Sequence, residues 1–281
     1  MRFSSLRING GIEGGIVIDG QVVTFSEIND RAGTNLPPNL IEFIQHPDFS
    51  VIQEVSETQS LTGIGRTFDQ ARFSAPFDCP PKILGIGLNY VDHAADLKAE
   101  VPSEPASFMK PRTTIIGPGE PIKLPSESKR VTAEAELGII IGKRCKNIYE
   151  HEASSVVFGY VPILDMTAED ILQRNPRFLT RAKSFDTFLS FGPVIYTPDE
   201  ITDLSNLTVK TMHNGRVIRS NKIRNMTFSP YKLIAFHSCV MTFEPGDIIC
   251  TGTPGAVVIE NGDVVRCEID GFAPLTNPVQ G

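Results

Sequence analysis

The stretch Glu134-Ala135-Glu136-Leu137-Gly138-Ile139-Ile140-Ile141 decides the fold and carries the first functional signal. Its apolar end predicts a buried strand over residues 136–141. Because side chains alternate between the two faces of a strand, Glu134 and Glu136 share one face at the entry to this core element. Two such carboxylates repel each other, and burial costs roughly several kcal/mol per unneutralised ion. A divalent cation is the simplest neutralising partner; an exposed strand end with two solvated acids is the alternative.

The composition indicates a globular protein with reduced cysteines. The 281 residues are 41% hydrophobic, and 26 basic against 33 acidic residues give a net charge of −7 without a basic stripe, so nucleic acid is not an expected partner. The five cysteines contain no CxxC pair and an odd count suits no closed disulfide set, which favours a cytoplasmic compartment. No signal peptide, arginine-rich transit peptide or membrane-length apolar run is recognised, so no membrane partner is expected, although a mitochondrial location stays open.

Many short strands and few helices predict an α+β, mostly β fold of the roll or barrel kind. Residues 1–70 are predicted to form a small α+β domain, with a hairpin turn at Asp19-Gly20 and a helix over 39–46. The proline-bearing residues 71–81 are interpreted as a linker, and 82–281 as the main β domain. In that domain we expect irregular structure over 101–130, helices over 153–157, 167–173 and 230–240, and strands over 83–88, 136–141, 160–164, 191–196, 207–213, 216–220, 247–250 and 263–269.

Asp165 follows the apolar strand 160–164 and would complete a cluster of three carboxylates with Glu134 and Glu136. An all-oxygen cluster suits Mg²⁺ or Mn²⁺ and leaves positions for water and substrate. The alternative is that Asp165 caps the helix over 167–173, because Asp is a favoured N-cap residue. Its position alone favours neither interpretation.

Three further segments carry residues able to do chemistry. His93 precedes Asp96 by three residues, so on a helix the acid could orient the imidazole as a general base, although a surface histidine with an incidental acid is the commoner case. Lys183 could hold a substrate carboxylate or enolate, or could be a solvated surface lysine. The loop 251–255, Thr-Gly-Thr-Pro-Gly, could bind anionic oxygens through hydroxyl and backbone N–H groups, or be an ordinary turn.

Taken together, these segments closely resemble the fumarylacetoacetate hydrolase family, over about Lys82 to Asn277. The resemblance is closest to its acylpyruvase, oxaloacetate decarboxylase-tautomerase and 2-hydroxyhepta-2,4-diene-1,7-dioate isomerase branch. The N-terminal 70 residues resemble the variable small domain of longer members. The motifs occur in the family's order: Gly87-Leu88-Asn89-Tyr90-Val91-Asp92-His93, Glu134-Ala135-Glu136-Leu137-Gly138 with Ile141-Gly142-Lys143, Asp165-Met166-Thr167-Ala168, Ala182-Lys183-Ser184-Phe185-Asp186-Thr187, and Pro245-Gly246-Asp247 with Thr251-Gly252-Thr253-Pro254.

The resemblance implies a mixed β-sandwich roll, usually a homodimer, with Mg²⁺ or Mn²⁺ held by Glu134, Glu136 and Asp165. It implies a catalytic histidine at His93, oriented by Asp96, on a lid that orders when substrate binds. The substrate-binding residues that it implies are Tyr90, Lys183, Gly252 and Thr253.

Two positions depart from the family pattern. Asp96 stands where members usually place Glu, which shortens the reach to the imidazole by one methylene. Glu169 stands where members usually place Arg, four residues after the metal-binding Asp. If Glu169 faces the pocket, a dicarboxylate substrate loses a partner and gains a repelling charge. Candidates to compensate for this loss are Arg174, Arg177 and Arg181.

The expected function is a metal-dependent hydrolase that cleaves a C–C bond in an acylpyruvate or related β-diketo acid, through a metal-stabilised enolate and a water activated by His93. The second hypothesis uses the same enolate without water attack, for oxaloacetate decarboxylation, keto–enol tautomerisation or isomerisation of an unsaturated 2-oxo acid. The third hypothesis is a catalytically weak metal-binding protein. Glu169 favours it, whereas the retention of all three acids argues against it.

Overall fold

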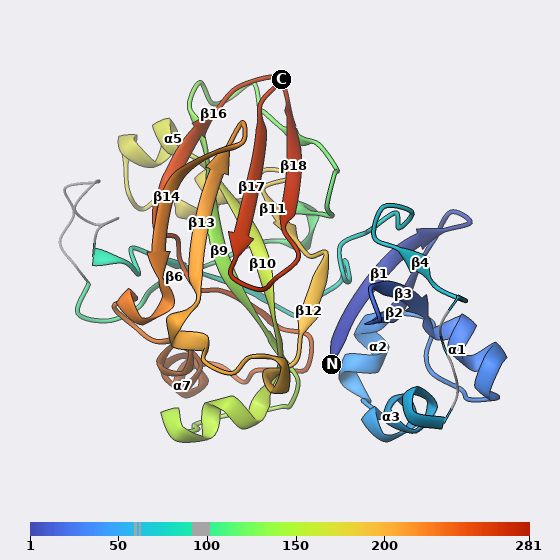
Figure 1. Cartoon of the computed structure of the whole chain (residues 1–281). Helices are drawn as coiled ribbons and strands as arrows, with labels where there is room; N and C mark the ends of the chain where they lie inside the picture. Colours follow the sequence, from blue (N-terminus) through green and yellow to red (C-terminus); the bar gives the residue numbers. More distant parts are fainter. Residues whose placement is uncertain (59–60, 62, 92–101) are drawn as a thin grey trace.

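The structure is a computed structural model that describes residues 1–58, 61, 63–91 and 102–281 (Figure 1). Its strands form one 13-stranded mixed sheet and one 5-stranded sheet, with short helices at the margins, which confirms the mostly β prediction. The helices are α1 (Phe25–Ala32), α2 (Leu40–Gln45), α3 (Phe49–Thr58), α5 (Glu169–Arg174), α6 (Leu179–Lys183) and α7 (Pro230–Val240). None of the described helices is long and apolar enough to cross a membrane.

The large sheet runs in the order β4-β3-β2-β1-β12-β10-β9-β15-β5-β6, with β7, β11 and β16 attached beside it. Its strands are β1 (Arg2–Ile8), β2 (Gly11–Ile18), β3 (Gln21–Thr24), β4 (Arg66–Thr67), β5 (Ile83–Gly87), β6 (Ala106–Met109), β7 (Ile115–Ile116), β9 (Val131–Ile141), β10 (Val157–Ala168), β11 (Leu189–Phe191), β12 (Val194–Tyr196), β15 (Ile248–Cys250) and β16 (Ala256–Ile259). The small sheet contains β8 (Ile122–Lys123), β13 (Thr208–His213), β14 (Arg216–Lys222), β17 (Val264–Ile269) and β18 (Leu275–Gln280).

The N-terminal segment follows its local sequence signals. Asp19 and Gly20 both have positive φ in the turn between β2 and β3, as a tight hairpin requires. The side chain of Asn39 accepts a hydrogen bond from the first turn of α2, so this helix begins where it was predicted. The segment is also joined to the main body, because β1 pairs antiparallel with β12 and extends the large sheet. The division of the chain at residues 71–81 stays a prediction.

The central strands β9 and β10 are longer than the sequence predicted. Every residue of both strands is buried, and they pair antiparallel along nearly their whole length. On one face of β9, the apolar side chains from Val131 to Ile141 at alternate positions join the core beneath the small sheet. The other face presents Thr132, Glu134, Glu136 and Ile140, so the acids are part of a buried strand face.

The small sheet covers one side of this central pair, as Figure 1 shows for β13 and β17 in front of β9 and β10. Its outermost strand β14 pairs only with β13 among the described strands, and its residues 216–220 are exposed. The hairpin turn at Asn214-Gly215 that joins β13 to β14 confirms the sequence prediction.

Several predicted element boundaries were wrong, and two of them bear on the site. The strand predicted over 160–164 continues to Ala168 as β10, and the following helix α5 begins at Glu169 instead of residue 167. Asp165 therefore lies inside a strand and is not the N-cap of that helix. In addition, the residues 101–130 expected to be irregular contain the short strands β6, β7 and β8. Helix α7 was predicted with its observed ends.

Candidate metal and substrate site

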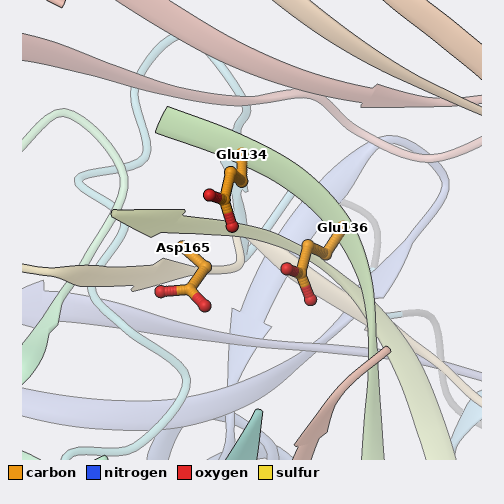
Figure 2. Close-up of side chains that lie close together, drawn as sticks. All are labelled: Glu134, Glu136 and Asp165. Atoms are coloured by element: carbon orange, nitrogen blue, oxygen red, sulfur yellow. The ribbon is translucent and has the colours of Figure 1, made fainter. Parts of the chain in front are cut away.

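The three predicted carboxylates come together at the centre of the large sheet. Asp165 on β10 lies directly opposite Glu134 on β9, and Glu136 is two residues further along the same face. One oxygen of each carboxylate lies within 4.8 Å of the others, and Figure 2 shows the side chains converging. Glu136 and Asp165 are 1% and 0% exposed. The cluster is therefore a product of strand register, and not of a strand end as the sequence suggested.

Two buried lysines neutralise part of this charge. The Nζ of Lys183, at the end of α6, lies 2.7 Å from Oε2 of Glu134 and 3.0 Å from Oδ2 of Asp165. The Nζ of Lys110 donates to Oδ1 of Asp165 at 2.6 Å and to the carbonyl oxygen of Lys183 at 2.5 Å. The Phe108 ring covers the Lys183 ammonium, 5.2 Å from the ring centroid. Lys183 thus forms ion pairs with two of the three carboxylates, and its role towards a substrate stays a prediction.

The sequence interpretation missed Lys110, which is 4% exposed. Its backbone N–H donates to the carbonyl of Ile83, so it directly follows the pairing of β6 with β5. The available signal was a single lysine between an apolar strand and a proline, in Phe108-Met109-Lys110-Pro111. That signal was weak because a lysine next to a strand is usually solvated.

The electrostatics of the site favour an additional cation. With all groups ionised, three carboxylates face two ammonium groups and leave one negative charge. Burial, followed by repulsion from Asp165, raises the pKa of Glu136 well above its ordinary value. Burial also lowers the pKa of Lys110, against the attraction of Asp165. For Lys183, burial acts in the same direction, but the three carboxylates together raise its pKa.

Further hydrogen bonds fix the orientation of the two glutamates. Thr167 donates its hydroxyl to Oε1 of Glu134 at 2.9 Å, and the backbone N–H of Gly252 donates to Oε2 of Glu136 at 2.8 Å. Gly252 has a φ of +93°, and a Cβ at this position would lie 2.8 Å from the Cβ of Asn89. A side chain at residue 252 would therefore displace the loop from Glu136.

The other predicted substrate-binding residues lie around this cluster. Thr253 is 3% exposed, and its hydroxyl exchanges hydrogen bonds with the backbone of Gly255, so it shapes the loop. Tyr90 is completely buried, and its hydroxyl has no hydrogen-bond partner among the described residues. Burial and the nearby Glu136 carboxylate raise the pKa of this phenol, so it stays protonated. His93 and Asp96 lie outside the described residues.

Glu169 does not present an uncompensated charge. Its carboxylate accepts a hydrogen bond from Nε of Arg130 at 2.6 Å and from Nε2 of Gln173 at 3.0 Å. Arg130 precedes β9 and was not among the compensating arginines that the sequence suggested, whereas Arg174 of that group is bound to Asp170. The expected repulsion by Glu169 is therefore neutralised locally.

The donor set fits a hard divalent cation. Three carboxylates with no nitrogen or sulfur ligand among them match the oxygen preference of Mg²⁺ and Mn²⁺. The net negative charge of the cluster also favours a further cation, and the Tyr90 hydroxyl, which has no partner among the described residues, could bind a further polar group. Glu134, Glu136 and Asp165 are the residues that would hold the ion.

Comparisons with known proteins identify the family to which the chain is similar. Residues 82–280 match the protein-family model described as fumarylacetoacetate (FAA) hydrolase C-terminal. The chain is 35% identical to the mitochondrial oxaloacetate tautomerase of Rattus norvegicus, over 96% of this chain and 86% of that protein. A solved 2-hydroxyhepta-2,4-diene-1,7-dioate isomerase from Mycobacterium marinum superposes with a TM-score of 0.78 at 30% identity, covering 100% of this chain and 98% of that one. A maleylpyruvate hydrolase from Sphingobium sp. SYK-6, solved with manganese(II) and pyruvate, gives a TM-score of 0.81 at 31% identity, covering 100% and 99%.

Proposed function

The chain belongs to the fumarylacetoacetate hydrolase family, and we propose that it is a divalent-metal-dependent enzyme that interconverts the keto and enol forms of a 2-oxo acid such as oxaloacetate. The observation that carries this proposal is the buried cluster of three carboxylates and two lysines. The relative named oxaloacetate tautomerase, which matches 96% of the chain, supports the choice of reaction. We therefore prefer the hypothesis without water attack to the hydrolase hypothesis that the sequence favoured.

The residues of the chain supply binding, charge and a proton donor. When bound, Mg²⁺ or Mn²⁺ would act as a Lewis acid towards the 2-oxo acid end of the substrate. The Lys183 ammonium stabilises negative charge on a substrate oxygen as a proton leaves the adjacent carbon, and its burial strengthens this interaction. The protonated Tyr90 hydroxyl is a donor without a competing partner among the described residues. His93, oriented by Asp96, remains the proposed base.

Lys110 has a different task in this scheme. Because Lys110 and Lys183 bind opposite oxygens of Asp165, they fix this carboxylate in one orientation. Preorganisation of charged groups in a buried site removes the cost of reorienting them during the reaction. We therefore assign Lys110 to positioning of Asp165 and Lys183 to contact with the substrate.

Hydrolysis of an acylpyruvate is the second candidate function, supported by the structural likeness to maleylpyruvate hydrolase. It requires the same cluster together with a water molecule activated by His93. Decarboxylation of oxaloacetate and isomerisation of an unsaturated 2-oxo acid use the same enolate, and the likeness to the isomerase supports the latter. The proposed assembly is a homodimer, as the family resemblance implies.

A product-resolved proton NMR time course tests these proposals. Manganese-loaded protein is incubated with oxaloacetate, acetylpyruvate and fumarylpyruvate, each with an EDTA control. The tautomerase predicts EDTA-sensitive acceleration of keto–enol conversion and of deuterium exchange at C3 of oxaloacetate, while the acylpyruvates stay intact. EDTA-sensitive release of pyruvate with acetate or fumarate would instead establish the hydrolase.

Two variants connect the activity to the cluster. Lys183→Met should reduce turnover by at least about a hundredfold, because one charge-stabilising donor typically contributes on that order. Glu13→Gln, a change of a carboxylate on β2 outside the cluster, should leave turnover unchanged. Equal activity of wild type and Lys183→Met on all three substrates would refute the assignment of this cluster as the active site.

A further inference from the structure

A single peptide group connects the proposed metal ligand Glu136 to a buried asparagine. The peptide between Thr251 and Gly252 donates its N–H to Oε2 of Glu136 at 2.8 Å. Its carbonyl oxygen accepts a hydrogen bond from Nδ2 of Asn89, also at 2.8 Å. Because a trans peptide group is planar, its C=O and N–H point in opposite directions and turn together. The bond from Asn89 therefore fixes the direction in which the N–H of Gly252 points.

The glycine at residue 252 makes this peptide group easy to turn. Such a rotation changes ψ of Thr251 and φ of Gly252, and glycine adopts positive and negative φ almost equally well. Thr251 is held on its other side, since its N–H and its hydroxyl both donate to the carbonyl oxygen of Leu137. Without the bond from Asn89, the peptide group could turn its carbonyl oxygen towards Glu136, where two acceptors would repel each other.

The side chain of Asn89 is itself held in the interior by its own hydrogen bonds. It is 0% exposed; its Oδ1 accepts from the N–H of Phe228 at 2.8 Å, and its Nδ2 donates to the carbonyl oxygen of Phe228 at 3.0 Å. A reversed amide would place its NH₂ group against an N–H and its oxygen against two carbonyl oxygens, so these partners determine its orientation. The backbone carbonyl of Asn89 also accepts from the N–H of Thr227 at 2.8 Å.

The end of strand β5 places Asn89 beneath the loop. The strand ends at Gly87, and Leu88 has a φ of +55°, a left-handed conformation that turns the chain. A Cβ at Gly252 would lie 2.8 Å from the Cβ of Asn89, so the asparagine and the loop are in direct contact. An alanine at residue 89 keeps this Cβ and loses only the amide group. Asn89→Ala therefore removes the hydrogen bonds and leaves the backbone contact in place.

We propose that Asn89 is a positioning residue for the metal site, which holds Glu136 in the orientation that binds the ion by fixing the peptide between residues 251 and 252. The inference rests on the metal dependence in the proposed function. A hydrogen bond to a carboxylate is charge-assisted, and hydrogen bonds in a chain polarise one another, so the donor of Asn89 strengthens the bond to Glu136. Groups that orient metal ligands from behind typically contribute about ten- to a hundredfold to metal affinity.

Binding of Mn²⁺ to the metal-free full chain tests the proposal. We expect Asn89→Ala to weaken Mn²⁺ binding by about tenfold or more, measured by isothermal titration calorimetry. Asn277→Ala is the matched control, because Asn277 is also 0% exposed and its Nδ2 also donates to two backbone carbonyls, those of Gly117 and Glu120. Neither carbonyl belongs to the loop 251–255, so this variant should keep Mn²⁺ affinity within about twofold of the wild type. Urea denaturation of both variants measures their loss of stability.

An NMR signal separates positioning from a general structural role. In metal-free protein with isotope-labelled threonine and glycine, the amide of Gly252 is observed through its bond to Thr251. In the wild type this amide proton, which is donated to a carboxylate, should resonate downfield and be protected from exchange with solvent. In Asn89→Ala it should move upfield and lose protection, whereas Asn277→Ala should leave both properties unchanged.

The outcomes separate this proposal from the proposed reaction. An Mn²⁺ affinity of Asn89→Ala within about twofold of the wild type, or an equal loss in Asn277→Ala, would overturn the proposal. If Asn89→Ala does not fold, the wild type decides, because a protected Gly252 amide supports the proposal and a freely exchanging one overturns it. If both expected changes occur but the wild type turns over no 2-oxo acid, the positioning role stands and the proposed reaction fails. A wild type that binds no Mn²⁺ would overturn both.

Discussion

The strands β9 and β14 reverse the usual relation between hydropathy and exposure. All of β9 is buried although it carries two glutamates, whereas β14 exposes Val217 and Ile218, which are 52% and 37% accessible. The position of a strand in its sheet decides this difference: β9 is paired on both sides, and β14 pairs only with β13 among the described strands. The two glutamates of β9 are therefore kept in the interior by their ion pairs and hydrogen bonds, because their side chains alone would favour solvent.

Asp165→Asn should have the largest effect on metal binding and on stability, because it removes the carboxylate that pairs with both buried lysines. We expect metal binding, measured by titration calorimetry with Mn²⁺, to weaken by at least about a hundredfold. We expect the metal-free protein to lose about 3 kcal/mol of unfolding free energy in urea, since Lys110 keeps a buried charge without its counter-ion.

The double variant Asp165→Asn with Lys110→Met is the matched control for this charge argument. It should regain part of the lost stability but none of the metal affinity, because the unpaired ammonium is removed as well. Ser220→Ala on the exposed strand β14 should change stability by less than about 0.5 kcal/mol. Loss of stability that is the same with and without Lys110 would contradict the ion-pair account.

Truncation of an apolar side chain should have an effect of intermediate size on the unfolding free energy, and this effect should differ between β9 and β14. Leu137→Ala removes a fully buried side chain from β9 and should destabilise the protein by about 2–5 kcal/mol. Ile218→Ala on β14 should cost less than about 0.5 kcal/mol. Urea denaturation of both variants measures the two free energies, and similar losses would show that β14 is covered in solution.

The smallest effect concerns a buried histidine that forms no ion pair with the described residues. His237 on α7 is 2% exposed; its Nδ1 lies 2.8 Å from the carbonyl oxygen of Leu233, and its Nε2 has no partner among the described residues. Burial lowers its pKa below the ordinary value of 6.5. Below about pH 6.5 the unfolded chain therefore binds a proton that the folded chain resists, so stability should fall with pH there.

His237→Gln should flatten this acid-side decline in unfolding free energy, measured by urea denaturation between pH 7.5 and 5 (about the range in which histidine titrates). The matched variant His46→Gln changes an exposed histidine at the end of α2 and should retain the wild-type slope. An unchanged slope in His237→Gln would mean that other groups cause the acid sensitivity.

The sequence predicted individual helices, strands and turns better than it predicted how the strands pair with one another. The hairpin turns and helix α7 followed from local signals, and the alternation along β9 predicted that Glu134 and Glu136 share a face. The register that brings Asp165 opposite Glu134 is non-local, so the sequence left its role open between metal ligand and helix cap. The family resemblance, and not the spacing of residues, favoured the metal ligand.

The charges that complete the site were harder to predict. Lys110 lies 55 residues from its partner Asp165 in the sequence, and Arg130 lies 39 residues from its partner Glu169. Each is a long side chain whose direction depends on tertiary packing. A lysine or arginine is usually solvated, so sequence reasoning assigns it to the surface by default. For Glu169, repulsion of the substrate was expected only if this acid faces the pocket, and the sequence did not predict its ion pair with Arg130, which precedes β9.

The pairing of β1 with β12 also bears on aggregation. Without β1, the outer edge of β12 would offer free backbone N–H and C=O groups, next to the aromatic surface where Phe158 packs against Phe3. Open, apolar strand edges are templates for pairing with other molecules. The N-terminal strands replace that edge with the two-residue strand β4, and short edge strands recruit neighbours poorly. A segment that contributes no residue to the carboxylate cluster is thus expected to protect the sheet that carries this cluster from self-association.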